Sequence, residues 1–469
     1  MFLKWCFGDF FLHRRPLLEN FFFLNIFLGV FFISFVFFEP SVSEFCFGLA
    51  LMSLVILLIQ KKITLPSQLS LADKSVVIFL LSNILGTFYA FFTVDIAHFL
   101  SIISFAVITF YSVGLYYLIR AAIRLEQKSG ESILRAFFSG IRICTYLSFG
   151  FFVLLERGVV NNIIFYDVRA RGFVKDPNVF AALLVASLLY EIIIAIKKET
   201  TQRSFYLSPN LLILGTMFVL TFSRGGVVNL ITSVVVLLFL MKDKKFFSKK
   251  MIIQSVVWSI LLPAMILSIG WSFNEFHRAI PFLIFHEPIS EQRYKDVSRS
   301  AFEKQTPMVA NFTPSNLITT LFVRPGAENL RVQLLEQTIK IKTNNFTGLA
   351  VSKNFYRAIN NIWRNFLFGV GPGFSSSLWE NFFHKKLSIH NSFLRVVIEN
   401  GFIGIFSFIV FLYALFKKTF SEYSSHLLGG DNYQIKCLFL AILSGILTQG
   451  MVIDILHWRF FWVLLGLMF

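Results

Sequence analysis

Apolar runs long enough to cross about 30 Å of bilayer hydrocarbon as a helix recur along this whole chain. They lie near residues 18–38, 43–60, 75–93, 97–119, 136–155, 178–196, 209–222, 226–241, 251–271, 391–416, 437–455 and 458–469, and several are short. Hydrophobic residues make up 56% of the sequence and the mean hydropathy is +0.70, which excludes a soluble protein. The predicted fold is an all-α, multi-pass membrane protein with about twelve transmembrane helices.

The distribution of lysine and arginine predicts the orientation of these spans. With the N-terminus in the cytoplasm, 22 of these cations fall in inward segments and six in the short outward segments and helix ends. Cytoplasmic loops of membrane proteins are enriched in Lys and Arg, so this orientation is the predicted one. The formal net charge of +17 is then mostly a topology signal, and nucleic-acid binding is not needed to explain it.

One long polar segment, at residues 272–390, faces outward in this topology. It divides the chain into transmembrane helices 1–9 (residues 1–271), an extracytoplasmic loop domain (272–390) and transmembrane helices 10–12 (391–469). Within the loop, residues 328–341 are compatible with a surface helix. Apolar residues recur at helical spacing over 352–367, which predicts an amphipathic helix that lies on the bilayer or caps the bundle. The four cysteines are scattered and indicate neither a disulfide framework nor a metal site.

Three polar motifs precede spans that run inward from the outer face. They are residues 169–178 (Arg169-Ala-Arg171-Gly-Phe-Val-Lys-Asp176-Pro177-Asn178), Ser223-Arg224-Gly225-Gly226 and Ser388-Ile-His390-Asn391. Each motif therefore sits at a helix N-terminus, where free N–H groups and the positive end of the helix dipole favour an anion. Two arginine groups and three helix starts on one face predict a pyrophosphate site.

His390 is the candidate base of this site. Next to a helix N-terminus the imidazolium is disfavoured, which keeps the ring neutral and able to accept a proton near pH 7. A neutral histidine suits activation of a hydroxyl group. Glu399 follows about 13 Å further along an ideal helix, too far to orient that ring, so we interpret it as buried or paired with an arginine.

Each motif also has a structural interpretation. An arginine at the end of a span commonly snorkels to the membrane interface, Asp-Pro-Asn starts helices in many proteins, and a lone histidine at a helix start is more often a cap. Asp454, His457 and Arg459, in the last outward hairpin, are interpreted as interfacial rather than catalytic. The sequence contains no Asp-x-Asp pair, no His-Glu-x-x-His and no Cys/His cluster, so no metal or other cofactor is predicted.

The same residues resemble the bacterial O-antigen ligase and polymerase superfamily. His390-Asn391, followed after nine residues by Gly401 and after two more by Gly404, is similar to the ligase pattern. Three further stretches resemble motifs of the family. Asn365-Phe-Leu-Phe-Gly369-Val-Gly371-Pro-Gly373 resembles its Pro-x-x-Gly-x-Gly turn. Ser223-Arg224-Gly225 resembles its Ser-Arg-Gly, and Arg171-Gly172 with Asp176-Pro177-Asn178 resembles its earlier arginine motif. The first of these has no proline before its first glycine. The similarity covers roughly residues 165–416.

The resemblance implies transfer of a glycan from an undecaprenyl-diphosphate carrier to an acceptor hydroxyl, without metal or nucleotide. The reaction would take place on the periplasmic face of the bacterial inner membrane. By analogy, Arg224 would hold the diphosphate leaving group and His390 would deprotonate or orient the acceptor hydroxyl. The substrate-binding residues implied beside them are Arg171, Arg169, Asn391 and Ser223.

Several functions share this signature. A ligase attaches the finished glycan to lipid A–core, whereas a polymerase joins repeat units into a growing glycan on the carrier. The histidine pattern and the single large outward loop favour the ligase, because polymerases commonly have two large loops. A related transferase that glycosylates protein is a third enzyme. A lipid-linked oligosaccharide transporter is the alternative of another class, but it is expected to carry cations inside its spans and two similar halves.

Overall fold

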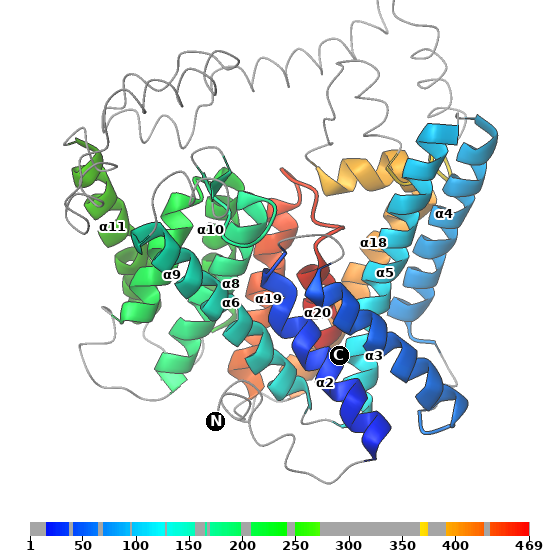
Figure 1. Ribbon diagram of the computed structural model, residues 1–469, viewed down its shortest axis with the longest axis horizontal. Helices are drawn as coiled ribbons and strands as arrows, with labels where there is room; N and C mark the ends of the chain where they lie inside the picture. Colours follow the sequence, from blue (N-terminus) through cyan, green and yellow to red (C-terminus); the bar gives the residue numbers. More distant parts are fainter. Residues whose placement is uncertain are drawn as a thin grey trace, which may run out of the picture.

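The computed structural model describes residues 16–36, 41–63, 69–93, 96–126, 129–154, 165–166, 169–197, 208–241, 249–272, 366–373, 391–425 and 432–468. This part of the chain is almost entirely helical (Figure 1). The helices are α2 (Leu17–Phe31, continued by the short η2, Phe32–Ser34), α3 (Val42–Ile59), α4 (Leu71–Thr93), α5 (Ile96–Leu125), α6 (Ser129–Leu154), α8 (Pro177–Lys197), α9 (Pro209–Leu220), α10 (Arg224–Leu240), α11 (Lys249–Ser272), α18 (Ser392–Ser425), α19 (Asn432–Gln449) and α20 (Arg459–Leu467).

The predicted helical class is confirmed for the described residues, and each predicted apolar run overlaps one of these helices. Seven helices in this part of the chain are long and apolar enough to cross a membrane, and four shorter apolar helices accompany them. The number of twelve crossings stays a prediction. The run predicted at 437–455 is wrong at its end, because α19 stops at Gln449 and residues 450–458 form a turn-rich connection that carries Asp454 and His457.

One element had no sequence signal. Strands β1 (Phe165–Tyr166) and β2 (Arg169–Ala170) form an antiparallel hairpin in which Phe165 pairs with Ala170 and Tyr166 with Arg169. Two-residue strands are too short to show a period of two, so they leave no pattern to detect.

Most of the predicted loop domain, including the surface helix at 328–341, lies outside the described residues. The last residues of the helix predicted at 352–367, Phe366 and Leu367, belong instead to a turn. His390 and Ser388 also lie outside the described part.

Helix α8 is enclosed by neighbouring helices. Its side chains are buried on every side, from Phe180 to Tyr190, against α6, α9, α10 and α19. A helix that is apolar all round is expected to be enclosed by protein, whereas α3 and α4 expose apolar stripes suited to lipid. Small residues bring the neighbours close: a Cβ added at Gly445 of α19 would lie 2.0 Å from Ser233 Oγ of α10.

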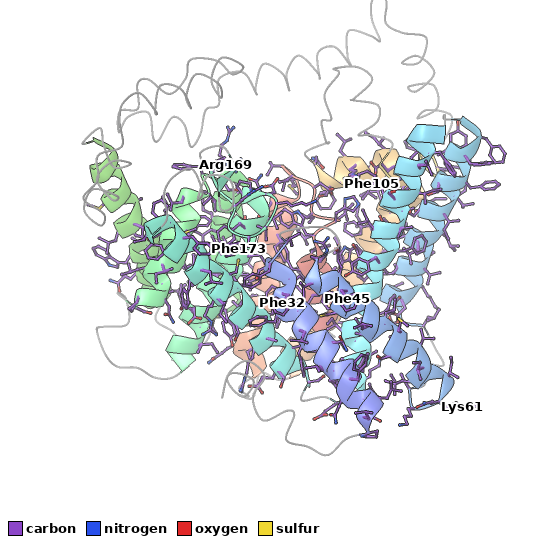
Figure 2. The ribbon with its side chains drawn as sticks, viewed as in Figure 1. Phe32, Phe45, Lys61, Phe105, Arg169 and Phe173 are labelled. Carbon is purple, nitrogen blue, oxygen red and sulfur yellow. The ribbon has the colours of Figure 1, made fainter. Side chains whose placement is uncertain are left out.

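The two ends of the bundle differ in the residues that they carry. Figure 2 shows Lys61 at the lower end and Arg169 and Phe105 at the upper end. This separation agrees with the predicted orientation, which puts Lys61 in the cytoplasm and Arg169 outside. The end that carries Arg169 is the upper end of the bundle in Figure 2.

Candidate functional site

A single side-chain amide joins the starts of α8 and α10. Asn178 Oδ1 accepts hydrogen bonds from Arg169 Nη2 (2.9 Å) and from Ser223 Oγ (2.8 Å). Arg169 Nε also donates to the carbonyl oxygen of Thr221, at 2.9 Å. The motifs at 169–178 and 223–226, which are far apart in the sequence, are therefore in direct contact.

The third predicted helix start lies against the end of α19. Ser392 N, in the first turn of α18, donates to Gly450 O (2.8 Å), directly after α19. Ser392 Oγ donates to Ile453 O (2.9 Å) and accepts from Ile455 N (2.8 Å). The start of α18 is thereby fixed to the connection between α19 and α20.

Gln449, the last residue of α19, completes the link between the three starts. Its Nε2 donates to the carbonyl oxygen of Asn178 (3.1 Å), and its Oε1 accepts from Asn229 Nδ2 of α10 (2.7 Å). Gln449 and Asn229 are both fully buried. The starts of α8, α10 and α18 therefore meet around the end of α19, as the predicted co-location on one face requires.

The polar residues at these starts act as helix caps. Ser223 Oγ accepts from Gly226 N (3.0 Å) at the start of α10, and Asn391 Oδ1 accepts from Leu394 N (2.9 Å) at the start of α18. Both caps satisfy N–H groups that the anion-site hypothesis had left free. The geometry thus gives Ser223 and Asn391 a structural role, and their part in substrate binding stays a proposal.

The arginines proposed to hold the diphosphate sit beside these contacts. Arg224 is the first residue of α10 and its side chain is exposed, while Arg171 follows β2 and is partly buried. Gly172 has φ +56°, and a Cβ there would lie 2.8 Å from Phe180 Cζ of α8. Only glycine lets this turn rest on α8, which explains the Arg-Gly order of the motif.

A mostly buried group of charged residues lies next to the start of α18. Arg395 Nε lies 3.0 Å from Glu399 Oε2, and Arg395 Nη1 also pairs with Asp454. His457 Nδ1 lies 3.0 Å from Asp454 Oδ2, and the guanidinium carbon of Arg395 lies 5.0 Å from the centroid of the Phe105 ring. The prediction that Glu399 is buried or pairs with an arginine is confirmed.

The charge state of Asp454 follows from this cluster. Burial alone would raise the pKa of its carboxyl group, but His457 and Arg395 outweigh burial and hold this pKa below its ordinary value. Asp454 is therefore a carboxylate at neutral pH. Arg459, grouped with it in the sequence, pairs instead with Glu44 of α3.

The glycine-rich turn at residues 366–373 fits into a break in α18. Gly401 interrupts the helix with φ 68° and ψ −169°, and Figure 1 shows the first part of α18 crossing the upper end before the rest runs down beside α4. Four backbone hydrogen bonds join turn and break: Phe402 N to Phe366 O, Ile403 N to Leu367 O, Val370 N to Ile398 O and Gly371 N to Glu399 O, at 2.9–3.1 Å. The turn thus replaces bonds that the helix loses at Gly401.

Glycine is required on both sides of this contact. A Cβ at Gly401 would lie 2.4 Å from Leu367 O, and a Cβ at Gly369 would lie 2.3 Å from Glu399 O. Both residues also have positive φ, 68° and 76°. The glycines of the turn at 366–373 and Gly401, which are separate in the sequence, therefore belong to one structural unit.

The contacts of Gln449, Asn229 and Arg395 were not predicted from the sequence. All three lie within predicted spans, and a buried polar residue in a membrane span is itself a signal of a contact or a functional site. Each of the three residues carries this signal, but the signal does not identify the residue with which it forms a hydrogen bond or ion pair.

Comparison with known proteins adds one match. A family model described as O-antigen ligase matches residues 209–409, from the start of α9 into α18. This segment contains Arg224, His390 and the turn at 366–373, whereas Arg169 and Arg171 precede it. No curated protein matches the chain.

Proposed function

Because this chain belongs to the O-antigen ligase and polymerase superfamily, we propose that it transfers a glycan from undecaprenyl diphosphate to an acceptor hydroxyl. The proposed site is the upper end of the bundle, on the periplasmic face of a bacterial inner membrane. The observation that supports this proposal is the meeting of the three helix starts around Gln449, since it brings the Arg171 and Arg224 segments together beside the segment that follows His390.

In the proposed reaction the acceptor oxygen attacks the anomeric carbon of the glycan. The bond from that carbon to the diphosphate oxygen breaks, and the lipid diphosphate leaves with the electron pair. His390 takes the proton of the acceptor hydroxyl. Arg224, helped by Arg171, holds the charge that develops on the diphosphate, and fixed cations aimed at such charge supply much of the rate in comparable enzymes.

Attachment of the finished glycan to lipid A–core is the reaction we favour. The pattern from His390 to Gly404 and the single large outward loop at 272–390 support ligation. Joining of repeat units into a growing glycan on the carrier is the alternative within the superfamily.

Deletion of the gene in its host tests the proposal. Loss of a ligase strands long glycan chains on the lipid carrier and leaves lipid A–core bare. Loss of a polymerase instead leaves surface lipid capped with a single repeat unit. Unchanged surface and carrier-bound glycan would contradict both reactions and leave the transporter and other functions to be tested.

A further inference from the structure

The hydrogen-bonding chemistry of Asn178 allows one arrangement. A guanidinium can only donate hydrogen bonds, so the amide must turn its oxygen, not its nitrogen, toward Arg169. Ser223 Oγ lies 2.8 Å from the same oxygen and must give its proton to it. The lone pairs of Ser223 are then available for Gly226 N, which lies 3.0 Å away. Each donor has one acceptor, and the orientation of the amide is fixed.

The backbone of Asn178 is held as firmly as its side chain. Its N–H donates to Asp176 Oδ1 (2.6 Å), and its carbonyl oxygen accepts from the buried Gln449 (3.1 Å). Asn178 therefore cannot rotate or shift without breaking contacts to three other segments.

The placement of Asn178 matters because of the residues that follow its partners. Arg169 lies two residues before Arg171, and Ser223 directly precedes Arg224. One oxygen atom thus fixes two backbone segments, each of which carries a proposed diphosphate ligand. We infer that Asn178 is a positioning residue, which sets the separation of Arg171 and Arg224 that a lipid-linked diphosphate requires. This inference rests on the proposed function.

The helices do not depend on this amide for their packing. A Cβ at Gly226 of α10 would lie 2.7 Å from Ala181 Cβ of α8, so these helices are in tight apolar contact within one turn of Asn178. Residues 180–190 of α8 are buried, and their apolar side chains belong to the hydrophobic core. Loss of Asn178 is therefore expected to move the two arginine segments while the bundle stays folded.

The test compares Asn178→Ala, Asn178→Asp and Asn25→Ala in the purified full-length protein. Asn25 of α2 is the matched control, because it is a buried amide that donates to Phe21 O of its own helix (2.8 Å) and lies outside the network around Asn178 and Gln449. Membranes of the deletion strain supply the probe substrates, which are the carrier-bound glycan and the bare lipid A–core. The readouts are kcat, KM for the carrier-bound glycan and the melting temperature.

Asn178→Ala is expected to lower kcat about 100-fold, the scale on which a displacement near 1 Å acts. Asn178→Asp keeps the acceptor oxygen, so kcat should recover most of this loss, while its negative charge raises KM for the diphosphate carrier. Asn25→Ala should lower the melting temperature and keep kcat within about twofold.

The inference is overturned if Asn178→Ala keeps the wild-type kcat, if Asn25→Ala loses as much kcat as Asn178→Ala, or if Asn178→Asp recovers none of it. Absence of transfer by the folded wild-type protein overturns the proposed function and the inference together. An active wild type with an unaffected Asn178→Ala variant overturns the inference alone.

Discussion

Arg224 carries the largest share of the proposed chemistry at the scale of single residues. Arg224→Ala is expected to lower transfer roughly 10²- to 10³-fold, the usual cost of losing one charge-stabilising donor. Arg224→Lys should restore only part of the transfer activity, because lysine offers a point charge in place of the planar guanidinium that matches a phosphate. Both variants are assayed by surface glycan in the complemented deletion strain, with membrane levels of the protein as the control. Near-normal transfer by Arg224→Ala would remove this residue from the mechanism.

Two variants of Asn391 distinguish its role as a helix cap from its proposed role in substrate binding. Asn391→Ser retains a side-chain oxygen for Leu394 N, whereas Asn391→Ala removes the cap at a cost of about 1 kcal/mol. If Asn391 also binds substrate, Asn391→Ser should keep the wild-type melting temperature and still raise KM. Equal KM values for Asn391→Ser and the wild type would leave this residue a cap only.

The depressed pKa of Asp454 predicts how the stability of the folded protein depends on pH. Its pKa is depressed in the folded protein, so the stabilisation that it contributes is complete above its ordinary pKa of about 4 and is lost as the pH falls further. Melting temperatures measured between pH 7 and pH 3 should fall more steeply below pH 4 for the wild type than for Asp454→Asn. Parallel curves would show that the carboxylate is not stabilised by Arg395 and His457.

At the scale of elements, the turn at 366–373 and the break in α18 behave as one unit. Gly401→Ala would force a Cβ to within 2.4 Å of Leu367 O at a φ of 68°, so the turn must separate from the break. We expect a clear loss of thermal stability and of transfer. Gly114→Ala is the control, because a Cβ there meets nothing within 4 Å and alanine favours a helix over glycine by about 1 kcal/mol. Similar melting temperatures for both variants would contradict this coupling.

A buried ion pair ties α4 to α5. Asp73 pairs with Arg120, whose Nη1 also donates to Tyr116 Oη (2.9 Å), and the side chains of the pair are 3% and 5% exposed. Removing one member leaves a buried charge without its partner, so Asp73→Ala should destabilise the protein by about 3–5 kcal/mol. Glu131→Ala, which breaks an exposed pair with Arg135, should cost only about 0.3–0.5 kcal/mol. Denaturant unfolding of the detergent-solubilised protein measures the loss of stability in both variants. Equal losses would contradict the larger contribution assigned to the buried Asp73–Arg120 pair.

The sequence predicts elements better than it predicts their contacts, and the reason is physical. An apolar run is a local property, so the helices could be located from composition alone, and topology was enough to bring Ser223 and the Asp176-Pro177-Asn178 motif to one face. Gln449 and Asn178 are 271 residues apart, and Arg395 and Asp454 are 59 apart. Nothing local marks such partners, and a polar residue in a span shows only that some partner is required.

Orientation is the prediction that concerns the whole molecule. In a variant with Cys6→Ser, the remaining cysteines, Cys46, Cys144 and Cys437, are buried and should label weakly. Lys62→Cys in this background is expected to react with a membrane-impermeant thiol reagent only after the cytoplasmic side is opened, because the cation distribution places it inside. Val452→Cys, in the connection after α19, should react from the outside. The reverse pattern would place the proposed site in the cytoplasm.

The bond between Gln449 and Asn178 also has a consequence in time. Synthesis proceeds at roughly 5–20 residues per second, so the 271 residues that separate this pair take on the order of tens of seconds to appear. During that interval α8 is already made, but the neighbour that closes its upper end is missing. The proposed site can form only after α19 has been inserted, so a nascent chain that holds both arginine segments is still inactive.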